Sequence, residues 1–192
     1  MNYQKFTNKV LKAYYKGKNL VIFNMGSSSL NFDSFGPILG TLLEEKHLKN
    51  FKIIGTMDNN VNAKNMKEKY NLINSETDFV IATDAAIANK EKSHENMILL
   101  KNSSIEPGSA MGKDLGSIGD ICIKYIVNDE YIQNIHKIMR LENPYNAAKI
   151  VSDFLKSIDN IIELEKVLYN KNKNKNKNKN KNKNNERSEG IC

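Results

Sequence analysis

Short apolar segments alternate with amphipathic ones through the first half of this 192-residue chain, and this alternation limits the fold more than any other feature. Five segments are typical of strands: 19–26, 51–57, 78–87, 96–102 and 120–127. The first, NLVIFNMG, is almost continuously apolar, as expected of a strand covered on both faces of a parallel sheet. The pattern predicts an α/β fold, a three-layer sandwich with a mainly parallel, twisted sheet of about five strands flanked by helices.

Apolar residues at helical spacing predict the remaining elements. The expected helices cover residues 3–17, 36–48, 63–72, 130–141 and 144–169. Pro37 and Pro144 stand at early helical positions, where the missing N–H costs least. We therefore divide the chain into an N-terminal helix (1–18), a single α/β peptidase-like domain (19–169) and a tail (170–192).

The tail is of low complexity, because lysine and asparagine alternate from Lys171 onward. This alternation offers no apolar side chain to bury, so the tail is predicted to be disordered. From Lys171 to Cys192 it holds seven lysines, one arginine and two glutamates, which is +6 of the total net charge of +7. The nearly neutral domain predicts no specific nucleic-acid partner. The tail is either a solvated segment without a dedicated role or a weak, salt-sensitive attractor of polyanions.

Neither a membrane nor an oxidising compartment is indicated. No apolar run approaches the roughly 18–20 residues that span a bilayer. The N-terminus lacks the apolar region and cleavage site of a signal peptide. Cys122 and Cys192 do not form a disulfide framework. We expect a cytoplasmic protein without a membrane partner.

Several motifs that would indicate a cofactor or a nucleophile are incomplete. GSAMGKD at 108–114 has the wrong glycine spacing for a phosphate loop, and GSSSL at 26–30 lacks the second glycine of a nucleophile elbow. His47, His94 and His136 have no spacing in common that would form a zinc site. No cofactor and no metal is therefore expected.

Two carboxylates fall where ligands bind in α/β sheets, beyond the carboxyl ends of strands. Asp33 follows the first predicted strand and Asp84 ends the third. Two neighbouring carboxylates can share a proton, one serving as base and the other as acid, or they can help to ligate a metal. The structural alternative is that Asp33 or Ser34 caps the next helix and that Asp84 caps a turn.

Three blocks resemble the YyaC-type sporulation proteins: NFDSFGPILGTLL (31–43), FVIATDAAIA (79–88) and SSIEPGSAMGKDLGSIGDICIKYIVN (103–128). That family is related to the germination protease of spore-forming bacteria and, more distantly, shares the fold of hydrogenase maturation proteases. The resemblance covers residues 19–165 approximately. It implies a sporulation-associated endopeptidase, located in the forespore or mother cell, that hydrolyses peptide bonds of spore proteins.

The resemblance also implies roles for individual residues. Asp33 and Asp84 match the two catalytic aspartates of the germination proteases. The loop at 105–113 would shape the site. Substrate-binding or site-shaping roles fall on Ser34, Gly36, Pro107, Gly108, Ser109, Gly112 and Lys113. The implied partner is a protein or peptide substrate, such as small acid-soluble spore proteins, and homo-oligomerisation stays open.

At three positions the chain departs from the family pattern. Ser28 stands in place of an acidic residue, Ser29 in place of an arginine and Asn62 in place of a histidine. These changes suggest an alternative, a catalytically inactive family member that acts as a binding or regulatory protein in sporulation. A third option is metal-dependent C-terminal processing of a partner, because Asp33 is placed like an acidic residue that contacts nickel in hydrogenase maturation proteases. The missing imidazole weighs against that option.

Overall fold

The computed structural model describes residues 1–88, 96–107, 116–128 and 139–188, with side chains described up to residue 171. Its strands are β1 (Asn19–Asn24), β2 (Phe51–Ile54), β3 (Asp78–Ala88), β4 (Ile98–Lys101) and β5 (Ile121–Asn128). They form one sheet in the order β2-β1-β3-β5-β4. Only the pairing of β4 with β5 is antiparallel. The predicted five-stranded, mainly parallel sheet is confirmed.

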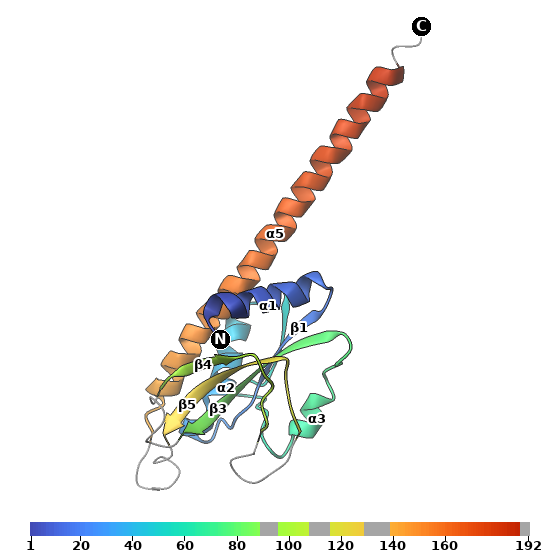
Figure 1. Ribbon diagram of the computed structural model, residues 1–192. Coiled ribbons are helices and arrows are strands. Elements are labelled where there is room, and N and C mark those ends of the chain that lie inside the picture. Colours follow the sequence, from blue (N-terminus) through green and yellow to red (C-terminus); the bar gives the residue numbers. More distant parts are fainter. Residues whose placement is uncertain (89–95, 108–115, 129–138, 189–192) are drawn as a thin grey trace.

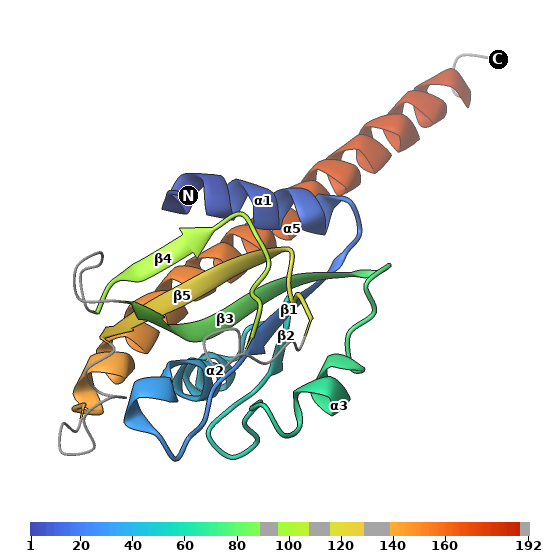
Figure 2. The same ribbon diagram turned by 60° about the horizontal axis from the view of Figure 1, so that its bottom comes forward.

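Helices cover both faces of this sheet (Figures 1 and 2). They are α1 (Tyr3–Tyr15), α2 (Phe35–Glu45), α3 (Met66–Tyr70) and α5 (Glu142–Ser188), with a 3-10 turn, η1, at Asn31–Asp33. One apolar cluster joins α1, α2 and α5 to the sheet, and a second joins α3 to the opposite face. Most of the predicted helix at 130–141 lies outside the described residues. The observed layers are those of the predicted sandwich.

Strand β1 shows how the sequence produces these layers. Five of its six residues are buried, which is expected of a parallel strand with helices on both sides. Leu20 and Ile22 pack into the cluster with α1, α2 and α5, whereas Val21 and Phe23 pack into the cluster with α3. The alternation follows from the two-residue period of a strand. A one-residue slip would exchange the two sets, so the register is strongly specified.

Helix α5 continues beyond the domain, through the segment for which the sequence predicts disorder. It ends at Ser188, and Figure 1 shows its final part projecting away from the sheet. A helix that is already formed and packed can be extended without a new nucleation cost, which explains the difference. Among the helices of the described residues, none combines the length and apolarity that crossing a bilayer requires.

A buried carboxylate fixes α5 to the start of β2. Asp159 has no exposed surface, and it accepts hydrogen bonds from the backbone N–H of Lys49 at 3.1 Å and of Asn50 at 3.0 Å. It also accepts bonds from the Asn50 side-chain amide at 2.8 Å and from the Lys156 ammonium at 3.1 Å. Although burial opposes ionisation, these donors hold the pKa of Asp159 below its ordinary value.

We expect Asp159→Asn to lower the free energy of unfolding by about 2 kcal/mol, because an amide cannot accept all of these bonds. The matched control is Asp153→Asn on the same helix, where the carboxylate is 60% exposed and pairs with Lys46. The control should change stability by less than about 0.5 kcal/mol. Urea unfolding at pH 7 measures both variants, and equal losses would contradict the role given to Asp159.

Candidate active site

The strand order reverses between β1 and β3, since the chain passes from β1 to β2 on one side and then returns to β3 on the other. Loops that follow the two strands therefore diverge and leave a crevice at their carboxyl ends. Asp33 lies in the loop after β1, and Asp84 lies within β3, one residue beyond its last paired position with β1. The neighbouring strands thus bring both predicted carboxylates to the same edge.

Two glycines hold the Asp33 loop against the end of β1. A Cβ atom at Gly26, where φ is +140°, would lie 2.1 Å from the backbone oxygen of Asp33. A Cβ atom at Gly36 would lie 2.1 Å from the backbone oxygen of Met25. The loop is also closed by the Ser27 N–H, which donates to the Asp33 carbonyl oxygen at 3.0 Å. No larger side chain fits at either glycine without moving the backbone.

Helix capping does not explain the side chains of Asp33 and Ser34. Ser34 occupies the N-cap position of α2 but makes no side-chain cap bond there. Its hydroxyl instead donates to the Asn31 carbonyl oxygen at 2.8 Å, and the residue is fully buried. Within the described part of the chain, α2 thus begins without a side-chain cap. Ser34 supports the turn that carries Asp33.

Asp33 and Asp84 line one cavity of about 280 Å³. Its polar lining is completed by Asn62, Glu106 and Lys124. The other lining residues are Met25, Gly26, Leu30, Phe32, Val61, Ala63, Met66, Ala85, Ala86, Ile87, Pro107 and Val127. A partly open cavity with mainly apolar lining residues and a few converging polar groups is typical of a binding or catalytic site.

Burial raises the pKa values of both carboxyl groups. It raises the pKa of Asp33 to about 6, although the Ser27 N–H acts in the opposite direction. It raises the pKa of Asp84 to about 7, and the negative charge of Asp33 adds to this effect. Lys124 and the Ala85 N–H lower the pKa of Asp84 but do not offset burial. The two carboxyl groups are close enough to influence each other and titrate near neutral pH.

Such a pair can hold one proton between two sites around neutral pH. The ionised member can accept a proton from water, and the protonated member can donate one to a leaving group. Perturbed pKa values in a cleft are a recognised mark of functional residues. The chemistry that this arrangement supports is general acid–base catalysis by a carboxyl pair.

Two charged residues of the cavity were not singled out individually from the sequence. Lys124 lies in register with Asp84 on the neighbouring strand β5, and Glu106 precedes Pro107 in the loop after β4. A signal for Lys124 was present in ICIKYIVN, where a lysine interrupts a buried strand and is the only charged residue in it. Glu106 lies in the predicted site-shaping loop at 105–113, but no sequence pattern distinguishes it from the other charged loop residues.

Three of the remaining predicted site residues lie in the described structure. Pro107 lines the cavity, whereas Ser34 and Gly36 are buried and support the Asp33 loop. The other four, Gly108, Ser109, Gly112 and Lys113, lie outside the described residues. Asn62, at the position of the missing histidine, does line the cavity.

The donor set does not favour a metal. Among the residues with described positions, no group of three or more His, Cys, Asp or Glu side chains is arranged to hold an ion. Among the described lining residues, the cavity offers carboxylates and a lysine but no imidazole, and nickel sites commonly use nitrogen or sulfur donors.

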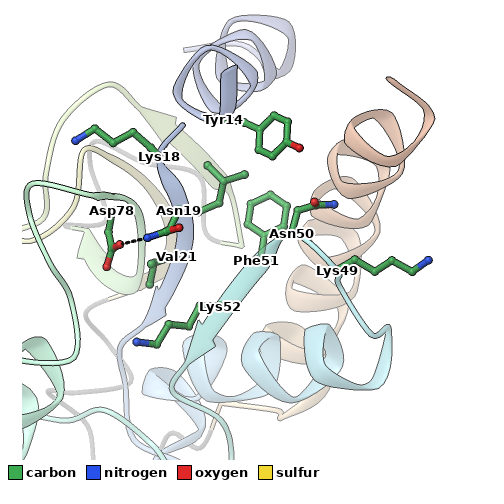
Figure 3. A pocket seen from close by; sticks show the side chains of 10 residues that line it. Tyr14, Lys18, Asn19, Val21, Lys49, Asn50, Phe51, Lys52 and Asp78 are labelled. Atoms are coloured by element: carbon green, nitrogen blue, oxygen red, sulfur yellow. Dashed lines mark hydrogen bonds between the residues drawn. The ribbon is translucent and has the colours of Figure 1, made fainter. Parts of the chain in front are cut away.

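A second hollow, of about 460 Å³, lies at the opposite end of β1 and β2 (Figure 3). Its lysines point in different directions and do not converge on one ligand position. The Lys52 ammonium donates to the Leu72 carbonyl oxygen at 2.8 Å, and Asp78 accepts a bond from Asn19 at 2.9 Å. These groups serve the local structure, so the carboxyl cavity is the better candidate.

Fold and site together define an α/β protein with a partly buried carboxyl pair at the switch point of a mainly parallel sheet. The chain belongs to the family described as "Protein of unknown function (DUF1256)", which matches residues 1–154. It is 31% identical over 147 residues to the uncharacterized protein YyaC of Bacillus subtilis, covering 74% of this chain and 71% of that relative.

Comparison with solved structures finds more distant likenesses. The [NiFe] hydrogenase maturation protease HycI of Thermococcus kodakarensis covers 77% of this chain and 99% of its own, with 16% identity and a TM-score of 0.45. An uncharacterized protein of Wolinella succinogenes covers 76% and 99%, with 13% identity and a TM-score of 0.45. The hydrogenase 2 maturation peptidase of a Thaumarchaeota archaeon covers 72% and 99%, with 16% identity and a TM-score of 0.36.

Removing one buried charge should stabilise the protein at high pH. The pKa of Asp84 is raised to about 7 from 3.8, so ionisation costs free energy that is absent below pH 4 and complete above pH 7. Asp84→Asn should therefore raise the free energy of unfolding at pH 8 by on the order of 2 kcal/mol, with little change at pH 4.

The control for this experiment is Asp78→Asn, whose carboxyl pKa is lowered by the Asn74 N–H. This substitution should reduce stability at pH 8, which is the opposite sign. Urea unfolding at both pH values provides the comparison. If Asp84→Asn instead lowers the free energy of unfolding at pH 8, the ionised Asp84 carboxylate does not destabilise the folded protein.

Lys124 should control the ionisation of Asp84. Lys124→Met removes the nearby positive charge, so the pKa of Asp84 should rise above about 7. Titration of the side-chain carboxyl carbon by NMR measures this change directly. Lys101→Met on β4 is the control and should leave Asp84 unchanged. If Asp84 has the same pKa in the wild type and in both variants, Lys124 does not influence its ionisation.

Proposed function

We propose that this protein is an aspartate-dependent endopeptidase in which Asp33 and Asp84 act on one water molecule. The observation that carries the proposal is that both carboxyl groups line one cavity with pKa values raised to about 6 and about 7. Groups that titrate near the working pH are the most effective proton acceptors and donors. Two isolated capping residues would not need to share a cavity or a charge interaction.

The reaction follows from the protonation states of the pair. The ionised carboxylate takes a proton from water as the water oxygen attacks the carbonyl carbon of the peptide bond. The protonated carboxyl group then supplies the proton that the departing amine needs, and the peptide C–N bond breaks. The lower pKa favours Asp33 as the ionised member and Asp84 as the protonated one. Because the sites are coupled, the pH profile belongs to the pair.

The biological setting that we propose is sporulation, with small acid-soluble spore proteins as substrates. Its support is the motif resemblance at 31–43, 79–88 and 103–128, together with the 31% identity to YyaC. The substrate class that we propose for this cavity is an unfolded or extended chain segment. Acid-soluble spore proteins are the first substrates to test.

Purified protein should cleave small acid-soluble spore proteins, and Asp33→Asn or Asp84→Asn should each reduce the rate by at least about 100-fold. Asp78→Asn removes a carboxylate at the opposite end of the sheet, outside the carboxyl cavity, and should retain activity within about twofold. Activity should be highest between about pH 6 and pH 7 and fall on both sides. The measurement is the rate of appearance of cleaved fragments by mass spectrometry.

Two results would refute the assignment. The first is a wild-type protein that cleaves none of these substrates across pH 5–8. The second is equal cleavage by wild type and both asparagine variants, which would indicate a contaminating peptidase.

A neutral hydrogen-bond network favours a second candidate, a binding or regulatory protein without catalysis. Asn62 donates to the side chain of Asn60 at 2.8 Å, and Asn60 donates to the Ser28 hydroxyl at 2.8 Å. Thus two of the positions that depart from the family pattern, Ser28 and Asn62, are joined through one uncharged network beside the cavity. A sporulation defect in the deletion strain, with full sporulation in the Asp33→Asn, Asp84→Asn strain, would select this candidate.

A further inference from the structure

The carboxyl-terminal part of β3 has one edge without a neighbouring strand in the described structure. β1 pairs with β3 only as far as Asn24 and Thr83. β5 continues on the other side, in register as far as Ala88 and Asn128. Figure 2 shows β3 and β5 side by side along this stretch. Five residues of β3, Asp84–Ala88, therefore extend past the end of β1.

The departure of the chain after β1 opens this edge. The Met25 N–H still donates to the Thr83 carbonyl oxygen of β3 at 2.9 Å. The Gly26 N–H donates to the Val61 carbonyl oxygen at 2.8 Å, on the side away from β3, as alternation along a strand requires. The next amide due to face β3, that of Ser27, donates instead to the Asp33 carbonyl oxygen at 3.0 Å, so the chain leaves β3 here. The backbone of β3 beyond Thr83 faces the crevice instead of β1.

The hydrogen bonds of β3 identify which of its backbone groups face the crevice. The Thr83 carbonyl points toward β1, whereas the Val80 carbonyl accepts from Asp120 on the β5 side at 2.8 Å. Odd-numbered residues of β3 therefore face β1, because backbone direction alternates along a strand. Beyond β1 the odd positions are Ala85 and Ile87. Among the described residues, the Ala85 C=O and both backbone groups of Ile87 have no hydrogen-bond partner.

The cavity lies along this open edge. Four consecutive residues of β3, from Asp84 to Ile87, line it. Side chains of a strand alternate between faces, so consecutive residues can line one cavity only where it runs along the edge. Asp33 and Val61, which belong to other segments of the chain, line the same cavity. The cavity thus borders both the carboxyl pair and the free backbone groups of Ala85 and Ile87.

We propose that the open edge of β3 at Ala85–Ile87 binds an extended peptide segment by strand addition. The peptide takes the position that β1 vacates and exchanges backbone hydrogen bonds with Ala85 and Ile87. Its backbone then passes Asp84, and the apolar cavity residues Leu30, Phe32 and Ile87 favour apolar side chains in the segment. This inference specifies how the proposed peptidase holds its substrate, but the binding step itself does not require catalysis.

A single extended chain fits this edge better than a second copy of the protein. Edge-to-edge pairing of two sheets needs an exposed, accessible strand. Here the open stretch is only five residues, about 16 Å at roughly 3.3 Å per residue. It borders the cavity that the carboxyl pair lines. So short an edge offers a second sheet few ladder hydrogen bonds, whereas a single extended peptide can use all of its free groups.

The test uses the full-length Asp33→Asn, Asp84→Asn protein, so that binding is measured without cleavage. The probe is reduced, carboxymethylated lactalbumin, a permanently unfolded chain that offers many extended segments. NMR titration of the ¹⁵N-labelled protein should give its largest amide shifts at Ala85 and Ile87. The amides of Ala82 and Ala86, which point to β5, should shift less.

A variant pair separates the backbone from the side chain. Ile87→Pro removes the N–H on the open edge, where no ladder bond is lost, and should weaken binding at least fivefold. Ile87→Val keeps the N–H and should bind within about twofold of the parent. Far-UV circular dichroism establishes whether each variant is folded. If the proline variant is unfolded, the NMR amide shifts of the parent protein test strand addition.

No binding of the probe, or amide shifts confined to another surface, would overturn strand addition at β3. Equal binding by the folded proline and valine variants would do the same. Failure of the peptidase proposal would look different. If the wild-type protein cleaves nothing but the Ala85 and Ile87 amides respond to the probe, the peptidase proposal fails and strand addition stands. Conversely, spore-protein cleavage by wild type without any response at β3 would reject strand addition alone.

Discussion

The contact between the start of α2 and the end of β1 is the constraint on which the rest of this site depends. It brings two backbones within a distance that excludes a Cβ atom at Gly26 and at Gly36. This close approach fixes the loop that carries Asp33 and directs the chain away from β3 after Met25. Both the carboxyl cavity and the open edge of β3 follow from this one contact.

The position of the carboxyl pair has an energetic consequence. Burial raises the pKa values of Asp33 and Asp84, so each ionisation near neutral pH is opposed by the fold. A protein under selection for stability alone would place apolar or uncharged residues there. Asp159 is the opposite case, because its four donor groups hold its pKa below the ordinary value and make its charge stabilising. Asp33 and Asp84 each have one backbone N–H that lowers the pKa, so the number of donors distinguishes them from Asp159.

Much of the fold could be predicted from the sequence because strand and helix periodicities are local properties. The apolar run at 19–26 predicted a strand buried on both faces, and β1 has that burial. The positions of Asp33 after the first predicted strand and of Asp84 at the end of the third predicted that they lie at one edge of the sheet, and they line one cavity. The expected strand end at Asp84 was wrong, because β3 continues to Ala88 beside β5. Lys124 was not identified, since its relevance depends on the in-register neighbour Asp84 across the β3–β5 ladder. Pairing between strands is a long-range property.

The sequence by itself determined the α/β class, the placement of the two aspartates toward the carboxyl ends of two strands and the family to which the chain belongs. These features depend on residue type and spacing along the chain. Only the tertiary structure decided the strand order, the partners that set the pKa values of Asp33 and Asp84, and the open edge at Ala85–Ile87. The physical reason is that burial, charge interactions and vacant backbone donors all depend on which distant segments pack together.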